Sequence, residues 1–175
     1  DATVAKQGSV LIVVSDADIG GTNVAKLNSI GAATSGVVTG TISGTEVQLD
    51  DLTTASTDAI TITVTGASVD IAEFNTLNAL TSEVPSLSCN ISDTIANISP
   101  GGTNVAGFTA ATGKLASVGV TITGANPTIT EINAVAAATT GQVNGELSNT
   151  KTELASLATN SSDFLVIIVA SGTMT

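Results

Sequence analysis

The chain has 175 residues and a net charge of −11, because 15 acidic side chains outnumber four lysines. It has no His, Tyr or Trp and a single cysteine. Four cations are too few to neutralise a nucleic-acid backbone, and without histidine neither a Ser-His-Asp triad nor a histidine metal site can form. This composition excludes the usual nucleic-acid-binding and triad-based classes, and we expect that the protein is not an enzyme.

Hydrophobic residues make up 42% of the chain, which is enough for a buried core and unlike a disordered acidic tail. The longest apolar run, residues 164–170, has the length of a strand and is far shorter than the ~20 residues of a membrane-spanning helix. We therefore predict no transmembrane segment. The sequence starts at Asp1 without an initiator methionine or a signal-like segment, which we interpret as a processed start or an excised module.

Internal repeats organise the chain. Two motifs return almost unchanged: Gly-Gly-Thr-Asn-Val-Ala at residues 20–25 and 101–106, and Ala-Ala-Thr-Ser/Thr-Gly at residues 32–36 and 137–141. An apolar residue followed by asparagine recurs at Asn28, Asn75 and Asn133. We predict an N-terminal arm, a repeat region and a C-terminal arm over residues 1–9, 10–170 and 171–175. The repeats are expected over residues 10–58, 59–116 and 117–163, with a half repeat over 164–170.

Alternating apolar residues mark the strands, and stretches with helical spacing lie between them. Seven strands are predicted, over residues 10–15, 37–43, 60–65, 86–92, 118–123, 143–148 and 165–170. Helical spacing is clearest over residues 68–80 and 129–138 and marks shorter helices near residues 47–52 and 154–157. These alternations predict an α/β repeat fold, a two-layer β-α solenoid with one mostly parallel sheet of about seven strands and short helices on one face.

The strand face that points away from the predicted helices is polar in the middle of the chain. Its threonines form a candidate ligand face: Thr39, Thr41, Thr61, Thr63 and Thr121. Flat Thr-x-Thr arrays are similar to the ice-facing surface of some β-solenoid antifreeze proteins. Threonine is also a favourable residue on any exposed strand, so the same pattern is compatible with a plain solvated face.

The first and last predicted strands are apolar on both faces. Leu11 and Val13 break the polar pattern at one end, and Phe164, Val166 and Ile168 break it at the other. Bare strands of this kind promote association, because they expose apolar side chains beside unpaired backbone groups. These five residues are therefore the candidate self-assembly site.

Three further features are weaker candidates. Cys89 falls in the inward register, where it is expected to act as a small core residue. The pairs Asp16/Asp18 and Asp50/Asp51 have the oxygen ligands that Ca²⁺ prefers but lack an EF-hand loop, so we expect solvated turns and no cofactor. Glycosylation sequons occur at Asn90, Asn97 and Asn160.

The repeats resemble a known class, and the resemblance covers nearly the whole chain, from about residue 10 to residue 170. The succession Thr-Ile-Thr-Gly-Ala at 121–125, Glu-Ile-Asn-Ala-Val-Ala-Ala-Ala-Thr-Thr-Gly at 131–141 and Glu-Leu-Ala-Ser-Leu-Ala at 153–158 is similar to repeats in very large secreted bacterial proteins, of cyanobacterial type. Such proteins are described as adhesin-like or surface-layer-like. The resemblance implies an extracellular or cell-surface structural role, without catalytic residues.

Two functions from different classes follow. The first is an extracellular structural protein that self-associates head-to-tail into a filament, sheath or surface layer, with itself or neighbouring repeats as partner. The alternative is an adhesin or ligand-binding repeat module, excised from a larger surface protein, that binds carbohydrate or ice through the threonine face. An enzyme scaffold without its catalytic part is a third interpretation.

Overall fold

The computed structural model describes Gly8, residues 10–80, 87–108, Leu115, and residues 118–124 and 126–170. Apart from Gly8, both predicted arms lie outside the described residues. The chain forms two compact units. Unit 1 comprises Asp1–Ala67 and Thr76–Cys89, and unit 2 comprises Ser68–Asn75 and Asn90–Thr175.

Unit 1 is built on a four-stranded parallel sheet in which strand order follows chain order, β1-β2-β3-β4. Its elements are β1 (Ile12–Val13), a 3-10 turn (Gly21–Asn23), α1 (Val24–Ala33), β2 (Val38–Gly44), α2 (Glu46–Leu49), β3 (Ala59–Val64) and β4 (Leu87–Ser88). Helix α3 (Ile71–Asn78) begins in unit 2 and ends in unit 1.

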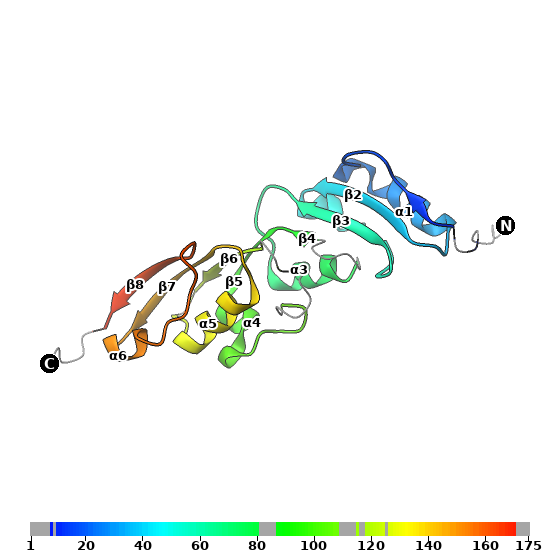
Figure 1. Ribbon diagram of the computed structural model, residues 1–175. Coiled ribbons are helices and arrows are strands. Elements are labelled where there is room, and N and C mark those ends of the chain that lie inside the picture. Colours follow the sequence, from blue (N-terminus) through cyan, green and yellow to red (C-terminus); the bar gives the residue numbers. More distant parts are fainter. Residues whose placement is uncertain are drawn as a thin grey trace. The chain divides into compact units, whose positions relative to one another are not determined.

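Unit 2 repeats this plan with the sheet order β5-β6-β7-β8, again parallel throughout. Its elements are β5 (Asn90–Thr94), α4 (Ile95–Ile98), a 3-10 turn (Pro100–Gly102), β6 (Gly119–Thr123), α5 (Ile129–Ala138), β7 (Val143–Asn149), α6 (Lys151–Leu154) and β8 (Phe164–Val169). The helices of this unit lie along one side of its sheet (Figure 1).

In the interior strands, the apolar residues predicted to face inward are mostly buried, and the polar residues between them face outward. Ile42 and Ile62 face inward and are fully buried, whereas Thr41 and Thr61 face outward and are half-buried. In unit 2 the aromatic rings of Phe74 and Phe108 pack edge to face with centroids 6.2 Å apart. The cores are otherwise aliphatic, as the low aromatic content requires.

The predicted single seven-stranded sheet is wrong, and with it the prediction of one two-layer solenoid. The described residues form two separate four-stranded parallel sheets, while the α/β alternation holds. The stretch predicted as one strand over residues 86–92 is divided at Cys89: β4 pairs with β3, and β5 pairs with β6.

A non-local contact explains the division at Cys89. The N–H of Val69 donates to the carbonyl of Asn90, and the carbonyl of Val69 accepts from the N–H of Ser92, both at 2.9 Å. Val69 therefore occupies the edge of β5 that a continuous sheet would offer to β3. Because each backbone group pairs once in a ladder, β3 can pair with only the first two residues of this stretch.

A constant offset of 105 residues relates two segments of the chain. Residues 24–64, the N-terminal module, contain α1, β2, α2 and β3; residues 129–169, the C-terminal module, contain α5, β7, α6 and β8 at the same relative positions. Sixteen of the 41 paired residues are identical. The two modules are therefore two versions of one structural unit within the chain.

Side-chain hydrogen bonds are repeated at this offset. Asn28 bridges Asp51 O and Thr53 N, and Asn133 bridges Ser156 O and Ala158 N. Asp58 accepts from the N–H groups of Val38 and Ala55, and Asp163 accepts from those of Val143 and Asn160. These bonds satisfy the first amide of the preceding strand and fix each loop.

Candidate functional site

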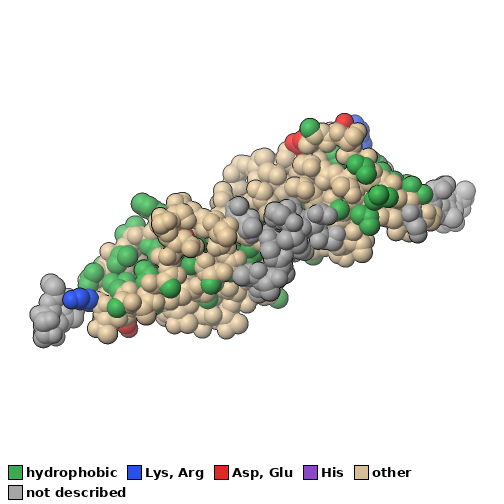
Figure 2. All heavy atoms as spheres, viewed as in Figure 1, with side chains coloured by type: hydrophobic (Ala, Val, Ile, Leu, Met, Phe, Trp, Pro, Cys, Tyr) green, Lys and Arg blue, Asp and Glu red, His purple; other side chains and the backbone are tan. Residues whose placement is uncertain are grey.

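Strand β8 is the exposed edge of the second sheet. Within the described residues it pairs with β7 alone, over its whole length. Its outward-facing side chains Phe164, Val166 and Ile168 are 65%, 49% and 44% exposed. Ile167 and Val169, on its other face, are also exposed. In the space-filling view apolar side chains gather over this strand (Figure 2).

The equivalent strand of the N-terminal module, β3, has a different outward face. At the 105-residue offset, Ala59, Thr61 and Thr63 correspond to Phe164, Val166 and Ile168. Small or hydroxyl side chains on the interior strand are thus replaced by large apolar ones on the edge strand. Sheet formation alone does not require this change, since β3 forms the same parallel pairs with β2 that β8 forms with β7.

The helix-side face of β8 is bare as well. Ile62 is completely buried, whereas the equivalent Ile167 is 48% exposed. The difference arises because β4 pairs with β3 at Ile62, and no described segment stands in the same place beside β8. Beside β3, Thr54 also donates its hydroxyl to the carbonyl of Leu80 at 2.9 Å.

Strand β1 is the corresponding free edge of the first sheet. The outward side chains of Val13, in this strand, and of Leu11, directly before it, are 64% and 63% exposed. The N–H groups of Ile12 and Val14 donate to Val37 O and Thr39 O of the neighbouring chain segment. Because successive backbone groups point to alternate sides of a strand, those of Leu11 and Val13 point to the unpaired edge.

All five residues predicted for self-assembly are therefore exposed on the outward faces of two edge strands. The structure places Leu11 and Val13 in unit 1 and Phe164, Val166 and Ile168 in unit 2. Their burial by a partner remains a prediction. Sequence reasoning missed the 105-residue offset that makes β3 the interior reference for β8; aligning the chain with itself at that distance reveals it.

The candidate threonine face is divided between the two sheets. Thr39, Thr41, Thr61 and Thr63 lie on the outward face of the first sheet, where only Thr41 and Thr61 pair directly. Thr121 lies in the second sheet between Ser92 and Asn144. All five are half-buried. A ligand for this face remains a prediction, and its regular array of threonines is limited to the first sheet.

Hydrogen bonds lower the pKa values of three carboxylates near the ends of elements, those of Asp18, Glu131 and Glu153. Ser43 and Gly20 donate to Asp18, which lowers its pKa. The backbone of Thr128 and then its hydroxyl lower the pKa of Glu131, and Thr150 acts in the same way on Glu153. These bonds form reciprocal capping boxes at α5 and α6.

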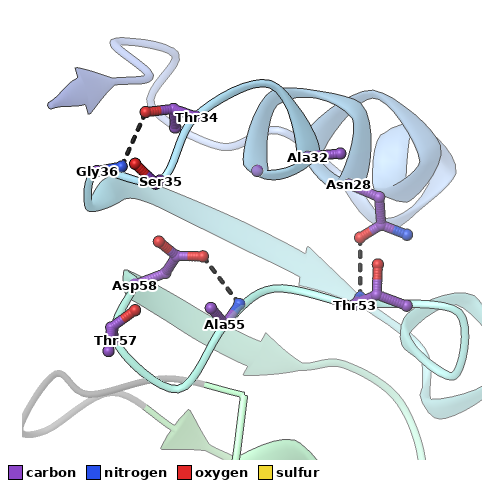
Figure 3. Close-up of a pocket in the computed structure, with 10 residues that line it drawn as sticks. Asn28, Ala32, Thr34, Ser35, Gly36, Thr53, Ala55, Thr57 and Asp58 are labelled. Carbon is purple, nitrogen blue, oxygen red and sulfur yellow. Dashed lines mark hydrogen bonds between the residues drawn. The ribbon is translucent and has the colours of Figure 1, made fainter. Parts of the chain in front are cut away.

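A pocket of about 400 Å³ opens beside the C-terminal end of α1. Figure 3 shows Asn28 of α1 above it and Thr53, Ala55 and Asp58 of the α2–β3 loop below it. Asn28 and Asp58 bond to backbone groups of this loop. These side chains of the pocket are therefore used to hold the loop in place. They do not form a set of groups that converges on a ligand.

The remaining candidates are Cys89, the aspartate pairs and the glycosylation sequons. Cys89 is buried, as its inward register predicted, and burial raises the pKa of its thiol to about 12. Asp18 bonds to Ser43 and Gly20, Asp50 and Asp51 are exposed, and no three potential metal-ligating side chains gather among the described residues. The sequon residues Asn90, Asn97 and Asn160 are all exposed.

Comparisons with family models, with curated proteins and with solved structures found no match for this chain. Across the part of the chain that the structure describes, no helix has both the length and the apolar character needed to span a membrane.

Proposed function

We propose that this protein is a structural protein that self-associates head-to-tail, with the outer edge of β8 in one copy against the outer edge of β1 in the next. The observation that carries the proposal is the replacement of Ala59, Thr61 and Thr63 in interior β3 by Phe164, Val166 and Ile168 in edge β8. If the outward face of β8 remained in contact with water, we would expect it to keep the small and hydroxyl side chains of β3.

The contact joins two different surfaces, and this determines the kind of assembly. A heterologous contact that does not close into a ring produces an open polymer. Fully burying one large aliphatic side chain stabilises by about 1.5–3 kcal/mol. The apolar side chains of β1 and β8 together therefore offset much of the association cost, which is about 4–15 kcal/mol.

The resemblance to adhesin-like and surface-layer-like repeats supports an extracellular or cell-surface filament, sheath or layer. The acidic composition is compatible with this role, because a net charge of −11 keeps free copies soluble and opposes binding to nucleic acid. The assembly is then formed by an apolar joint between copies that repel one another elsewhere.

Two single variants test the contact. Val13→Lys places a charge on the β1 edge, and Ile168→Lys places one on the β8 edge. The wild type is expected to form polymers with rising concentration in light scattering and negative-stain microscopy. Each variant alone should remain monomeric, and an equimolar mixture should form dimers and stop, because each variant retains the edge that the other has lost.

Thr63→Lys is the matched control, since Thr63 is the interior equivalent of Ile168. This variant should assemble like the wild type. Wild-type chains that stay monomeric at high concentration would contradict the proposal and favour a module whose edges are covered by neighbouring segments of a longer chain. Dimers of Val13→Lys alone would indicate symmetric β8–β8 pairing instead.

A further inference from the structure

We infer that the joint between copies repeats the pairing of β3 with β4, so that Ile167 of one copy lies opposite Ile12 of the next and Ile168 lies opposite Val13. This inference rests on the proposed function and adds to it the register of the two strands. It follows from three properties of the described edges: the interior equivalent of β8, the direction of the free backbone groups, and the side chains that would meet.

The interior equivalent supplies the template. In unit 1 the outer edge of β3 is paired with β4 at two positions, Ile62 with Leu87 and Thr63 with Ser88. At the 105-residue offset, Ile62 and Thr63 correspond to Ile167 and Ile168. The β8 edge is thus a second version of an edge that holds a two-residue parallel strand inside this chain, and β1 is also a two-residue strand.

The free backbone groups of the two edges match in this register. Ala170 donates its N–H to Asn149 O of β7, so the backbone groups of Leu165, Ile167 and Val169 point away from β7. On β1 the free groups are those of Leu11 and Val13. With Ile167 opposite Ile12, the N–H of Ile167 reaches the carbonyl of Leu11, and the N–H of Val13 reaches the carbonyl of Ile167.

The side chains match as well. Ile12 pairs with buried Val38 and therefore lies on the inward side of its sheet, like Ile167; Val13 pairs with Thr39 and lies on the outward side, like Ile168. A shift by one residue would place an inward side chain opposite an outward one. The interior pair Thr63–Ser88 becomes the apolar pair Ile168–Val13, which accounts for the apolar outward residues on both edges.

Disulfide cross-linking of full-length chains tests the register. Chains with Ile168→Cys are mixed with chains with Val13→Cys, allowed to assemble, and oxidised with diamide. Neighbouring strands lie about 4.8 Å apart, and disulfides need Cα atoms about 4.4–6.8 Å apart, so this pair should cross-link. Val166→Cys mixed with Val13→Cys is the matched control, at about 8 Å in the proposed register. The native chain, with its single buried Cys89, gives the background.

We expect the 168–13 dimer to form at least tenfold faster than the 166–13 dimer in a non-reducing gel. Preferential cross-linking of 166 to 13, or equal slow rates in chains that still polymerise, would overturn the register and leave head-to-tail assembly standing. Dimers of Ile168→Cys alone would overturn both proposals by showing β8–β8 pairing. Wild-type chains that never assemble would overturn the proposed function, and the register would fall with it.

Discussion

The two modules of this chain have closely similar local structures, yet some apolar positions that are buried in the N-terminal module are exposed in the C-terminal one. Leu49 is completely buried and Leu154 is partly exposed, and the same contrast separates Ile62 from Ile167. The capping at Thr45 recurs at Thr150. The difference therefore comes from the segment that follows each module: β4 lies beside the first, and no described segment lies beside the second.

An edge strand can be recognised by its sequence once an interior strand at the equivalent position is available. Exposure by itself is ambiguous, because much of any protein surface is apolar. In this chain, interior strand β3 shows which side chains occupy the same backbone positions when the strand is not at an edge. The replacement of Thr63 by Ile168 is a departure from that reference toward a surface that water does not favour.

The largest expected effect compares the buried leucine with its exposed equivalent. Leu49→Ala should lower the free energy of unfolding by about 3 kcal/mol, because it leaves a cavity around a fully buried side chain. Leu154→Ala should cost roughly 1 kcal/mol, since little apolar area is lost. Denaturant unfolding with Ile168→Lys in both proteins keeps assembly from contributing, and equal losses would contradict the contrast between the modules.

Next in size is an exchange of outward faces. The triple variant Phe164→Ala, Val166→Thr, Ile168→Thr gives β8 the face of β3. Losing about 1 kcal/mol of burial at each position should weaken assembly roughly 100-fold in concentration-dependent sedimentation. Circular dichroism should remain unchanged, because the substituted side chains are exposed in the single chain. Assembly at wild-type strength would show that these side chains do not form the joint.

A smaller effect is expected at Cys89, the residue between β4 and β5. Cys89→Ala should cost about 1 kcal/mol, as loss of a small buried side chain does. The native thiol should react slowly with a maleimide, because it is buried and its pKa is raised to about 12. A thiol introduced by Ile168→Cys is the fast-reacting reference in the same chain. Equal rates would show that the Cys89 side chain is open to solvent.

The smallest expected effect is on how stability changes with pH in the acidic range. The pKa values of Glu131 and Glu153 are lowered by bonds from Thr128 and Thr150, so the stabilisation is present above the ordinary value of 4.5 and is lost as pH falls through the lowered value. The N-terminal module has uncharged Gln48 in the corresponding capping box. Glu153→Gln should therefore flatten the fall in stability between about pH 5 and 3, and Gln48→Glu should steepen it. Unchanged slopes in both would contradict this account.

Local features of the fold were predictable from the sequence. The helix over residues 129–138 has its predicted bounds. Alternation also identified the buried side of interior strands, as Ile42 and Ile62 show. The division at Cys89 was not predictable, because it depends on Val69, which lies within the segment with helical spacing but pairs with a strand more than 20 residues away. The candidate edge residues could be identified from their apolar character. That β3 is the interior equivalent of β8 could be recognised only from the structure, in which β3 pairs with β4.

In the proposed polymer every joint would place β8 of one copy against β1 of the next, so the polymer would have a direction. β1 has two residues and β8 has six, so the two ends of a growing polymer present different templates to an arriving chain. The energy of adding a copy is the same at either end, since the same joint forms, but the routes to that joint differ. Growth from labelled seeds should therefore be faster at one tip than at the other, giving fibres with a leading and a lagging end.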